Sequence, residues 1–140
     1  MIEHVARIVL HHSASPRDTT TRDLIDQWHK AKGWEGVGYH YVIEANGEIK
    51  IGRELPQEGA HLMGMNKTSI GICVVGDNTQ PDQQWTPVQW HALKKLVDAL
   101  LVVWPGTSVV NHERAALKPT QCPGLDAAAL LEGMELDSIA

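Results

Sequence analysis

Three side chains that bind divalent metals well stand at or near the ends of short segments. His11 follows a strand-like run at residues 7–10, His112 comes shortly after another at residues 108–110, and Cys122 lies in the loop beyond. Neutral imidazole and thiolate are common zinc ligands, and a catalytic zinc site uses three protein ligands and leaves a fourth position for water. The three residues therefore predict a zinc site built from segments at opposite ends of the chain.

Each of these residues also has a plainer interpretation. An isolated His11 is more often a strand-end histidine than a ligand, and Cys122 could be a thiol beside a turn. His12 is the alternative to His11, because neighbouring strand residues point to opposite faces, and we interpret it as packing or supporting the site. A cysteine hydrolase, with Cys122 as nucleophile and His112 as base, is a rival function. The Pro-Gly that follows the cysteine is a poor helix start for activating a thiolate.

The composition limits the class of protein. The 140 residues fit one domain, 1–140, with 43% hydrophobic residues and a net charge of -5. The charge leaves no basic cluster for nucleic acid, and no apolar run is long enough to cross a membrane. We see no secretory signal, so we expect synthesis in the cytoplasm and no stable membrane association. Cys73, within an apolar run, and Cys122 are expected to be free thiols.

A helix and a β-hairpin are predicted after the run that ends at His11. Thr20 with Asp23 predicts the start of a helix, and Gly33 predicts its end. His29 lies off the apolar stripe of this helix, so we expect it on the solvated surface. Asn-Gly at 46–47, between alternating runs at 39–43 and 48–52, predicts a β-hairpin, because both turn residues need positive φ.

The second half of the chain contains the strand that precedes His112. Residues 69–75 form a continuous apolar run, which is typical of a strand buried on both faces. Thr86 and Pro87 predict the start of a helix that runs to about Val103, and residues 125–135 predict a final helix. The order of elements predicts a single-domain α/β fold, in which a central mixed β-sheet is flanked by α-helices.

These segments resemble the type 2 N-acetylmuramoyl-L-alanine amidases, the zinc family that includes phage lysozyme-amidases and peptidoglycan recognition proteins. The resemblance extends from Ile8 to about Leu131, is strongest to phage endolysins, and is highly specific because its motifs occur in this order. The motifs are residues 8–14, 27–30 with Gly33-Trp34, 37–41, Gly52-Arg53, Ala60-His61, Asn66 with 69–73, and 112–113 through 122–123.

The resemblance implies a zinc ion bound by His11, His112 and Cys122, and cleavage of the amide between N-acetylmuramic acid and L-alanine. Such an ion lowers the pKa of a bound water to roughly 7 and polarises a carbonyl. Tyr39 matches a family position beside the metal. Thr120 stands where many amidases have lysine and some catalytic relatives have threonine. We expect both side chains to act on the water or on the developing oxyanion.

Four further residues are candidates for contacts with the substrate, bacterial peptidoglycan: Trp34, His40, His61 and Asn66. Trp34 could instead lie at the edge of the core, His40 could pair with backbone beneath the sheet, and the other two could be solvated in a loop. The resemblance implies a monomeric phage or prophage endolysin that reaches the wall, in the periplasm, after the membrane is permeabilised. A peptidoglycan receptor without catalysis is the alternative.

Overall fold

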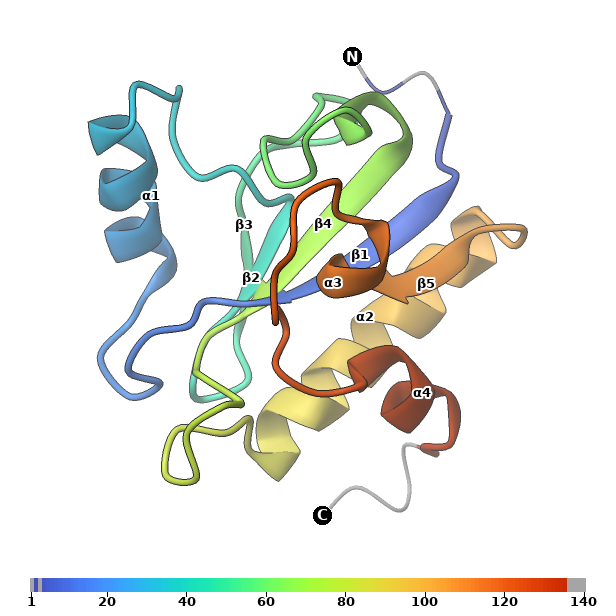
Figure 1. Cartoon of the computed structure of the whole chain (residues 1–140). Coiled ribbons are helices and arrows are strands. Elements are labelled where there is room, and N and C mark those ends of the chain that lie inside the picture. Colours follow the sequence, from blue (N-terminus) through green and yellow to red (C-terminus); the bar gives the residue numbers. More distant parts are fainter. Residues whose placement is uncertain (1, 3, 136–140) are drawn as a thin grey trace.

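The computed structural model describes residue 2 and residues 4–135, so the expected domain, 1–140, extends beyond them. Over the described residues the chain is built around one five-stranded sheet. Its strands are β1 (Arg7–His12), β2 (Tyr41–Ile43), β3 (Ile49–Ile51), β4 (Ser69–Val74) and β5 (Ser108–Asn111). Their spatial order is β3-β2-β4-β1-β5, with β3 antiparallel to β2 and the other pairs parallel (Figure 1). This confirms the predicted α/β fold with a central mixed sheet.

The helices are α1 (Arg22–Ala31), α2 (Pro87–Val103), α3 (His112–Ala115) and α4 (Ala127–Glu132), with a short 3-10 helix, η1, at Asn66–Thr68. They cover both faces of the sheet (Figure 1). α2 and α4 pack on one face, where they bury side chains against alternate strand residues such as Ile8 and Ile70. α1 covers the other face, where Ile25 packs in a smaller cluster with Cys73. Because Cys73 is the register partner of His11, the alternation of β1 places His11 on the α1 face.

The ends of the helices follow their capping residues. Thr86 and Gln89 form a complete capping box at the start of α2, which ends at Val103 as predicted. α1 is capped by Thr21 rather than Thr20: the Thr21 side chain accepts from the Leu24 N–H, whereas the Thr20 hydroxyl donates to the Pro16 carbonyl at 2.6 Å. Gly33 follows the C-cap of α1 and has a φ of 89°.

Two other expectations about local structure need correction. The last helix is shorter than 125–135, because Asp126 caps it and Gly133 ends it. The hairpin is present, but Gly47 alone of the two turn residues has positive φ, at 84°. The Gly47 N–H donates to the Glu44 carbonyl, and the Asn46 side chain accepts from the Glu48 N–H, which gives a longer loop than the predicted two-residue turn. No described helix is long and apolar enough to span the hydrocarbon core of a bilayer.

Candidate metal centre

The parallel sheet brings the two histidines of the candidate centre together. Leu10 of β1 is the register partner of Asn111 in β5, so the residues that follow, His11 and His112, lie side by side at the same end of the sheet. Their ring centroids are 4.4 Å apart. His112 is the first residue of α3, which turns the chain away from the sheet directly after the ligand candidate. The carboxyl ends of parallel strands are a common place for ligand sites.

The loop after α3 carries Cys122 back to the same place. The Glu113 N–H donates to the Cys122 carbonyl at 2.8 Å, which ties the two ends of the loop together. The Cys122 Sγ accepts from the backbone N–H of His12 at 3.3 Å, and the Asn78 amide donates to the Pro123 carbonyl at 2.8 Å. These contacts fix the thiol beside the end of β1, although it is more than a hundred residues away in the sequence.

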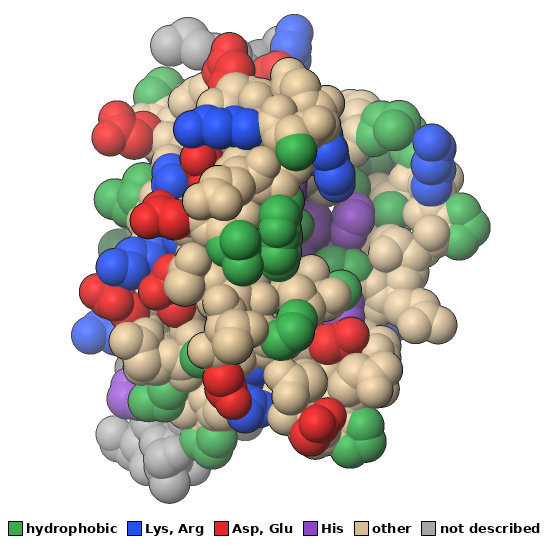
Figure 2. Space-filling model, turned by 90° about the vertical axis from the view of Figure 1, so that its left-hand side faces the viewer, with side chains coloured by type: hydrophobic (Ala, Val, Ile, Leu, Met, Phe, Trp, Pro, Cys, Tyr) green, Lys and Arg blue, Asp and Glu red, His purple; other side chains and the backbone are tan. Residues whose placement is uncertain are grey.

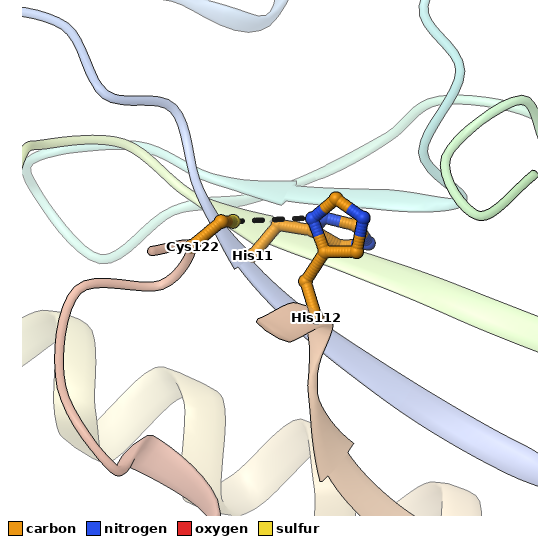
Figure 3. A group of neighbouring side chains, drawn as sticks. All are labelled: His11, His112 and Cys122. Atoms are coloured by element: carbon orange, nitrogen blue, oxygen red, sulfur yellow. Dashed lines mark hydrogen bonds between the residues drawn. The ribbon is translucent and has the colours of Figure 1, made fainter. Parts of the chain in front are cut away.

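The three side chains present one ligand atom each within 4.8 Å of one another (Figure 3). The Cys122 Sγ lies 3.8 Å from Nδ1 of His11. The Nδ1 of His112 is buried and has no hydrogen-bond partner among the described residues. His12 lies outside this group, because its Nδ1 accepts from the Asn78 N–H at 3.2 Å. The donor set and its spacing suit a tetrahedral zinc ion that keeps one position open.

The electrostatics of the three side chains also fit a divalent cation. Burial, with the charges of His61 and His112, holds the pKa of His11 well below its ordinary value, and burial lowers the pKa of His112. Both imidazoles are therefore neutral near pH 7, which is the form that binds metals. Burial raises the pKa of the Cys122 thiol to about 12, so its ionisation requires a positive charge close to the sulfur. A divalent ion at the three ligand atoms would supply that charge.

These residues form the floor of a cleft of about 740 Å³. Figure 2 shows histidine side chains at the bottom of a hollow, with hydrophobic side chains along one edge. Trp34 and Met63, both substantially exposed, are among the apolar residues that line the cleft. A mainly apolar cleft with a few convergent polar groups is the usual form of a substrate site.

Two further predicted residues reach this cleft beside the candidate ligands. The ring of Tyr39 lies 4.9 Å from the ring of His11, between centroids. Burial, with the thiols of Cys73 and Cys122 nearby, holds the pKa of Tyr39 well above its ordinary value, so its hydroxyl remains a donor. Thr120 also lines the cleft, and its Oγ1 accepts from the Cys122 N–H at 3.2 Å.

The four residues predicted to contact substrate have different environments. Trp34, His61 and Asn66 line the cleft. Asn66 uses its side-chain oxygen to accept the N–H groups of His61 and Leu62, at 3.1 and 2.9 Å. His40 does not line the cleft, and it is 1% exposed. Its Nδ1 accepts from the Gly71 N–H and its Nε2 donates to the Gln57 carbonyl, so His40 braces the backbone and does not support the substrate contact that we expected.

His29 was not predicted as a residue of the site, and its predicted position on the solvated surface is wrong. It is 7% exposed, lies on the wall of the cleft and packs edge-on against Trp34 at 4.6 Å between ring centroids. The loop after α1 folds back over the helix, where Val37 N–H donates to Asp26 and Gly38 N–H donates to His29 Nδ1 at 2.8 Å. The spacing of Asp26 and His29, one helical turn apart ahead of a glycine-rich loop, is the signal that could have indicated this.

The chain is similar to known proteins in both sequence and fold. The family model described as N-acetylmuramoyl-L-alanine amidase matches residues 3–125. The endolysin of Klebsiella phage KP32 is 36% identical over 139 residues, which are 96% of this chain and 90% of that protein. The endolysin of Escherichia phage T7 is 36% identical over 138 residues, with the same shares covered, 96% and 90%. The solved structure of the Ph2119 endolysin, from a Thermus scotoductus bacteriophage, has a TM-score of 0.81 at 31% identity, over 91% of this chain and 82% of that chain.

Proposed function

Because the chain belongs to the N-acetylmuramoyl-L-alanine amidase family, as a type 2 amidase related to phage endolysins, we propose that it is a zinc-dependent enzyme. The reaction is hydrolysis of the amide between the lactyl group of N-acetylmuramic acid and L-alanine in bacterial peptidoglycan. The observation that carries the proposal is the convergence of His11, His112 and Cys122, whose ligand atoms lie within 4.8 Å of one another at the floor of the cleft.

In this proposal His11, His112 and Cys122 hold the zinc ion. When bound, zinc lowers the pKa of a water and polarises the amide carbonyl as a Lewis acid. The Tyr39 hydroxyl, kept protonated by burial, donates a hydrogen bond to the water or to the oxygen on which negative charge develops. The Thr120 hydroxyl lies on the Cys122 side of the cleft and supplies a second donor there.

The cleft walls orient the substrate. Trp34, 37% exposed, offers an aromatic face to a sugar ring or a stem peptide. Asn66 shapes another part of the wall by holding the backbone of His61 and Leu62 in place. We propose that Asn66 supports the wall of the cleft, because its side-chain oxygen already accepts two backbone N–H groups.

A cysteine nucleophile is the rival mechanism, and the environment of Cys122 disfavours it. Burial raises the pKa of the thiol to about 12, whereas a nucleophilic cysteine needs a lowered pKa or an adjacent base. The His112 Nδ1 is buried without a hydrogen-bond partner among the described residues, so it is not paired with the thiol as a base would be. The metal and the cysteine mechanisms make opposite predictions for chelation.

The test is hydrolysis of purified sacculi, with free amino termini of L-alanine as the product measured. Treatment with a chelator should abolish product release, and added zinc should restore it. Activity that persists in the metal-free protein would contradict zinc dependence and favour the cysteine mechanism. A protein that binds sacculi with zinc present but releases no L-alanine amino termini would be a receptor instead of an enzyme.

We also propose that the protein acts on the wall once another factor has opened the inner membrane. The matched endolysins are phage proteins. Expression of the chain alone in a Gram-negative host should be tolerated, and the same cells should lyse when a permeabilising agent is added. Lysis of unpermeabilised cells at the same level of expression would overturn this proposal. A host that makes the His112→Ala protein is the matched control, because permeabilised cells should then remain intact.

A further inference from the structure

We propose that His61 is a positioning residue that orients the ring of His11 and selects its tautomer, so that Nδ1 of His11 is the atom presented to the metal. The inference rests on the proposed zinc site. It replaces the substrate contact that the sequence predicted for His61 with a contact to a ligand residue.

The two ring nitrogens of His11 face different partners. Nε2 lies 3.0 Å from Nδ1 of His61, and Nδ1 lies 3.8 Å from the Cys122 Sγ. A neutral imidazole has one N–H donor and one unprotonated nitrogen, and only the unprotonated nitrogen can bind a metal. If Nδ1 of His11 faces the metal, Nε2 carries the proton and donates it to Nδ1 of His61.

The opposite arrangement would block the site. If Nδ1 of His61 carried the proton, it would donate to Nε2 of His11, and the proton of His11 would then sit on Nδ1, beside Cys122. Two neutral rings in contact allow only these two arrangements, so the tautomer of His61 decides the tautomer of His11. The two ring nitrogens of His61 have different surroundings: Nδ1 lies 3.0 Å from Nε2 of His11, and Nε2 is buried without a hydrogen-bond partner among the described residues. In the metal-binding arrangement the proton of His61 is on Nε2, which leaves Nδ1 as the acceptor for the proton on Nε2 of His11.

The ring of His61 is held in place by the strand beneath it. Gly71 of β4 leaves the space that the ring fills, because a Cβ at this position would lie 2.6 Å from Cγ of His61. Gly59 is equally close, since a Cβ there would lie 2.5 Å from Cδ2 of the same ring. The ring of His40 packs edge-on at 5.8 Å between centroids. Asn66 accepts from the His61 N–H at 3.1 Å, so both the backbone and the ring are fixed.

This arrangement is what a support for a metal ligand requires. Histidine ligands generally donate their second ring nitrogen to a carbonyl, a carboxylate or a similar acceptor, and loss of that acceptor typically lowers metal affinity by about 10- to 100-fold. His11 makes this contact to an imidazole that is itself braced by packing and by a backbone hydrogen bond. A residue that contacted substrate instead would need an accessible polar atom in the cleft, whereas Nδ1 of His61 is directed at His11 and its Nε2 is buried.

The test uses two variants of the full chain and measures zinc affinity by competition with a chelator. His61→Phe keeps a ring of similar size and removes the acceptor, so zinc affinity should fall by about 10- to 100-fold. His61→Asn places an amide oxygen close to the position of Nδ1 and should retain most of the affinity. His91→Phe is the matched control, because His91 is exposed on α2, and its zinc affinity should equal that of the unchanged protein.

A second measurement needs no variant and therefore does not depend on how the variants fold. Nitrogen-15 NMR of the histidine rings in the zinc-loaded protein should show the proton of His11 on Nε2 and the metal at Nδ1. Zinc bound through Nε2 would overturn the inference. So would a His61→Phe protein that binds zinc as tightly as the unchanged chain and shows only a raised KM, which is the result expected of a substrate contact. Failure of the unchanged chain to bind zinc would instead contradict the proposed function.

Discussion

At the scale of single residues, the chemistry depends on groups whose ordinary properties are changed by burial. His11 and His112 are kept neutral, Tyr39 is kept protonated, and the Cys122 thiol needs a nearby cation to ionise. Each of these changes suits a metal centre in which imidazole and thiolate bind and a tyrosine hydroxyl donates. The proposed metal ligands and the proposed hydrogen-bond donor are therefore different side chains, and substitution can test the two roles independently.

Tyr39→Phe tests the donor role, because it keeps the ring and removes only the hydroxyl. Zinc content and melting temperature should be nearly unchanged, and turnover on sacculi should fall at least tenfold, a loss of about 1.4 kcal/mol in transition-state stabilisation. Thr120→Val should act in the same direction, more mildly. Near-normal turnover in Tyr39→Phe would remove this hydroxyl from the mechanism. Lost stability with normal activity per folded molecule would show that Tyr39 serves packing.

His29 makes a prediction about acid stability. Burial, with the charges of Lys32 and Arg53, lowers its pKa from 6.5 to about 4. As the pH falls from 6.5 towards 4, the unfolded chain takes up a proton that the folded chain does not, so stability present above pH 6.5 is lost across this window. The loss amounts to up to about 3 kcal/mol. His29→Asn keeps an acceptor for the Gly38 N–H without titrating, so its free energy of unfolding should fall less steeply over this range.

Urea unfolding at several pH values measures this difference. The two proteins should differ most in their pH dependence between pH 4 and 6.5, and both should still lose stability in acid, because burial also lowers the pKa values of His40 and His61. Parallel curves for the unchanged protein and His29→Asn would show that His29 titrates normally and is not the buried neutral group described above.

At the scale of elements, features set by neighbouring residues were predictable and features set by distant segments were not. The capping box at Thr86 and the apolar run of β4 are local patterns, and both were predicted closely. His29 was misplaced because the loop that buries it folds back from residues 36–38. The hydrogen-bond partners of His40, Gln57 and Gly71, come from separate segments, so no local pattern indicated them. The candidate ligands were found because their residue types are specific, while the contact between His11 and His61 had no local signal.

Gly71 of β4 tests how the sheet supports the centre. An alanine Cβ at this position would lie 2.6 Å from Cγ of His61, and the residue is in a strand, so the expected effect is steric. Gly71→Ala should destabilise the protein by about 1–3 kcal/mol, as overpacking commonly does, and should also weaken zinc binding. Gly106→Ala is the matched control, because a Cβ there meets nothing within 4 Å. Unchanged zinc affinity in a folded Gly71→Ala protein would mean that the ring of His61 can move without effect on His11.

At the scale of the whole molecule, the fold joins ligands that are far apart in the chain. The parallel pairing of β1 with β5 aligns His11 with His112, and the loop after α3 returns Cys122 to the end of β1. A zinc ion bound there would link the first strand to the last quarter of the chain. It would stabilise the folded state by about 2.7 kcal/mol when its free concentration is 100 times its Kd. The proposed zinc centre would thus also be a structural link between β1 and the segment that follows β5.

The most direct test of the zinc centre is the zinc content of the purified protein beside that of its single-alanine variants. The unchanged chain should carry one zinc per molecule, and His11→Ala, His112→Ala and Cys122→Ala should each lose metal and activity together. His12→Ala is the matched control, because the Nδ1 of His12 is bound to the backbone of Asn78 and lies outside the group of candidate ligands. This variant should keep more zinc than His11→Ala. A fully active His112→Ala protein, or a His12→Ala protein that loses zinc while His11→Ala retains it, would contradict the account.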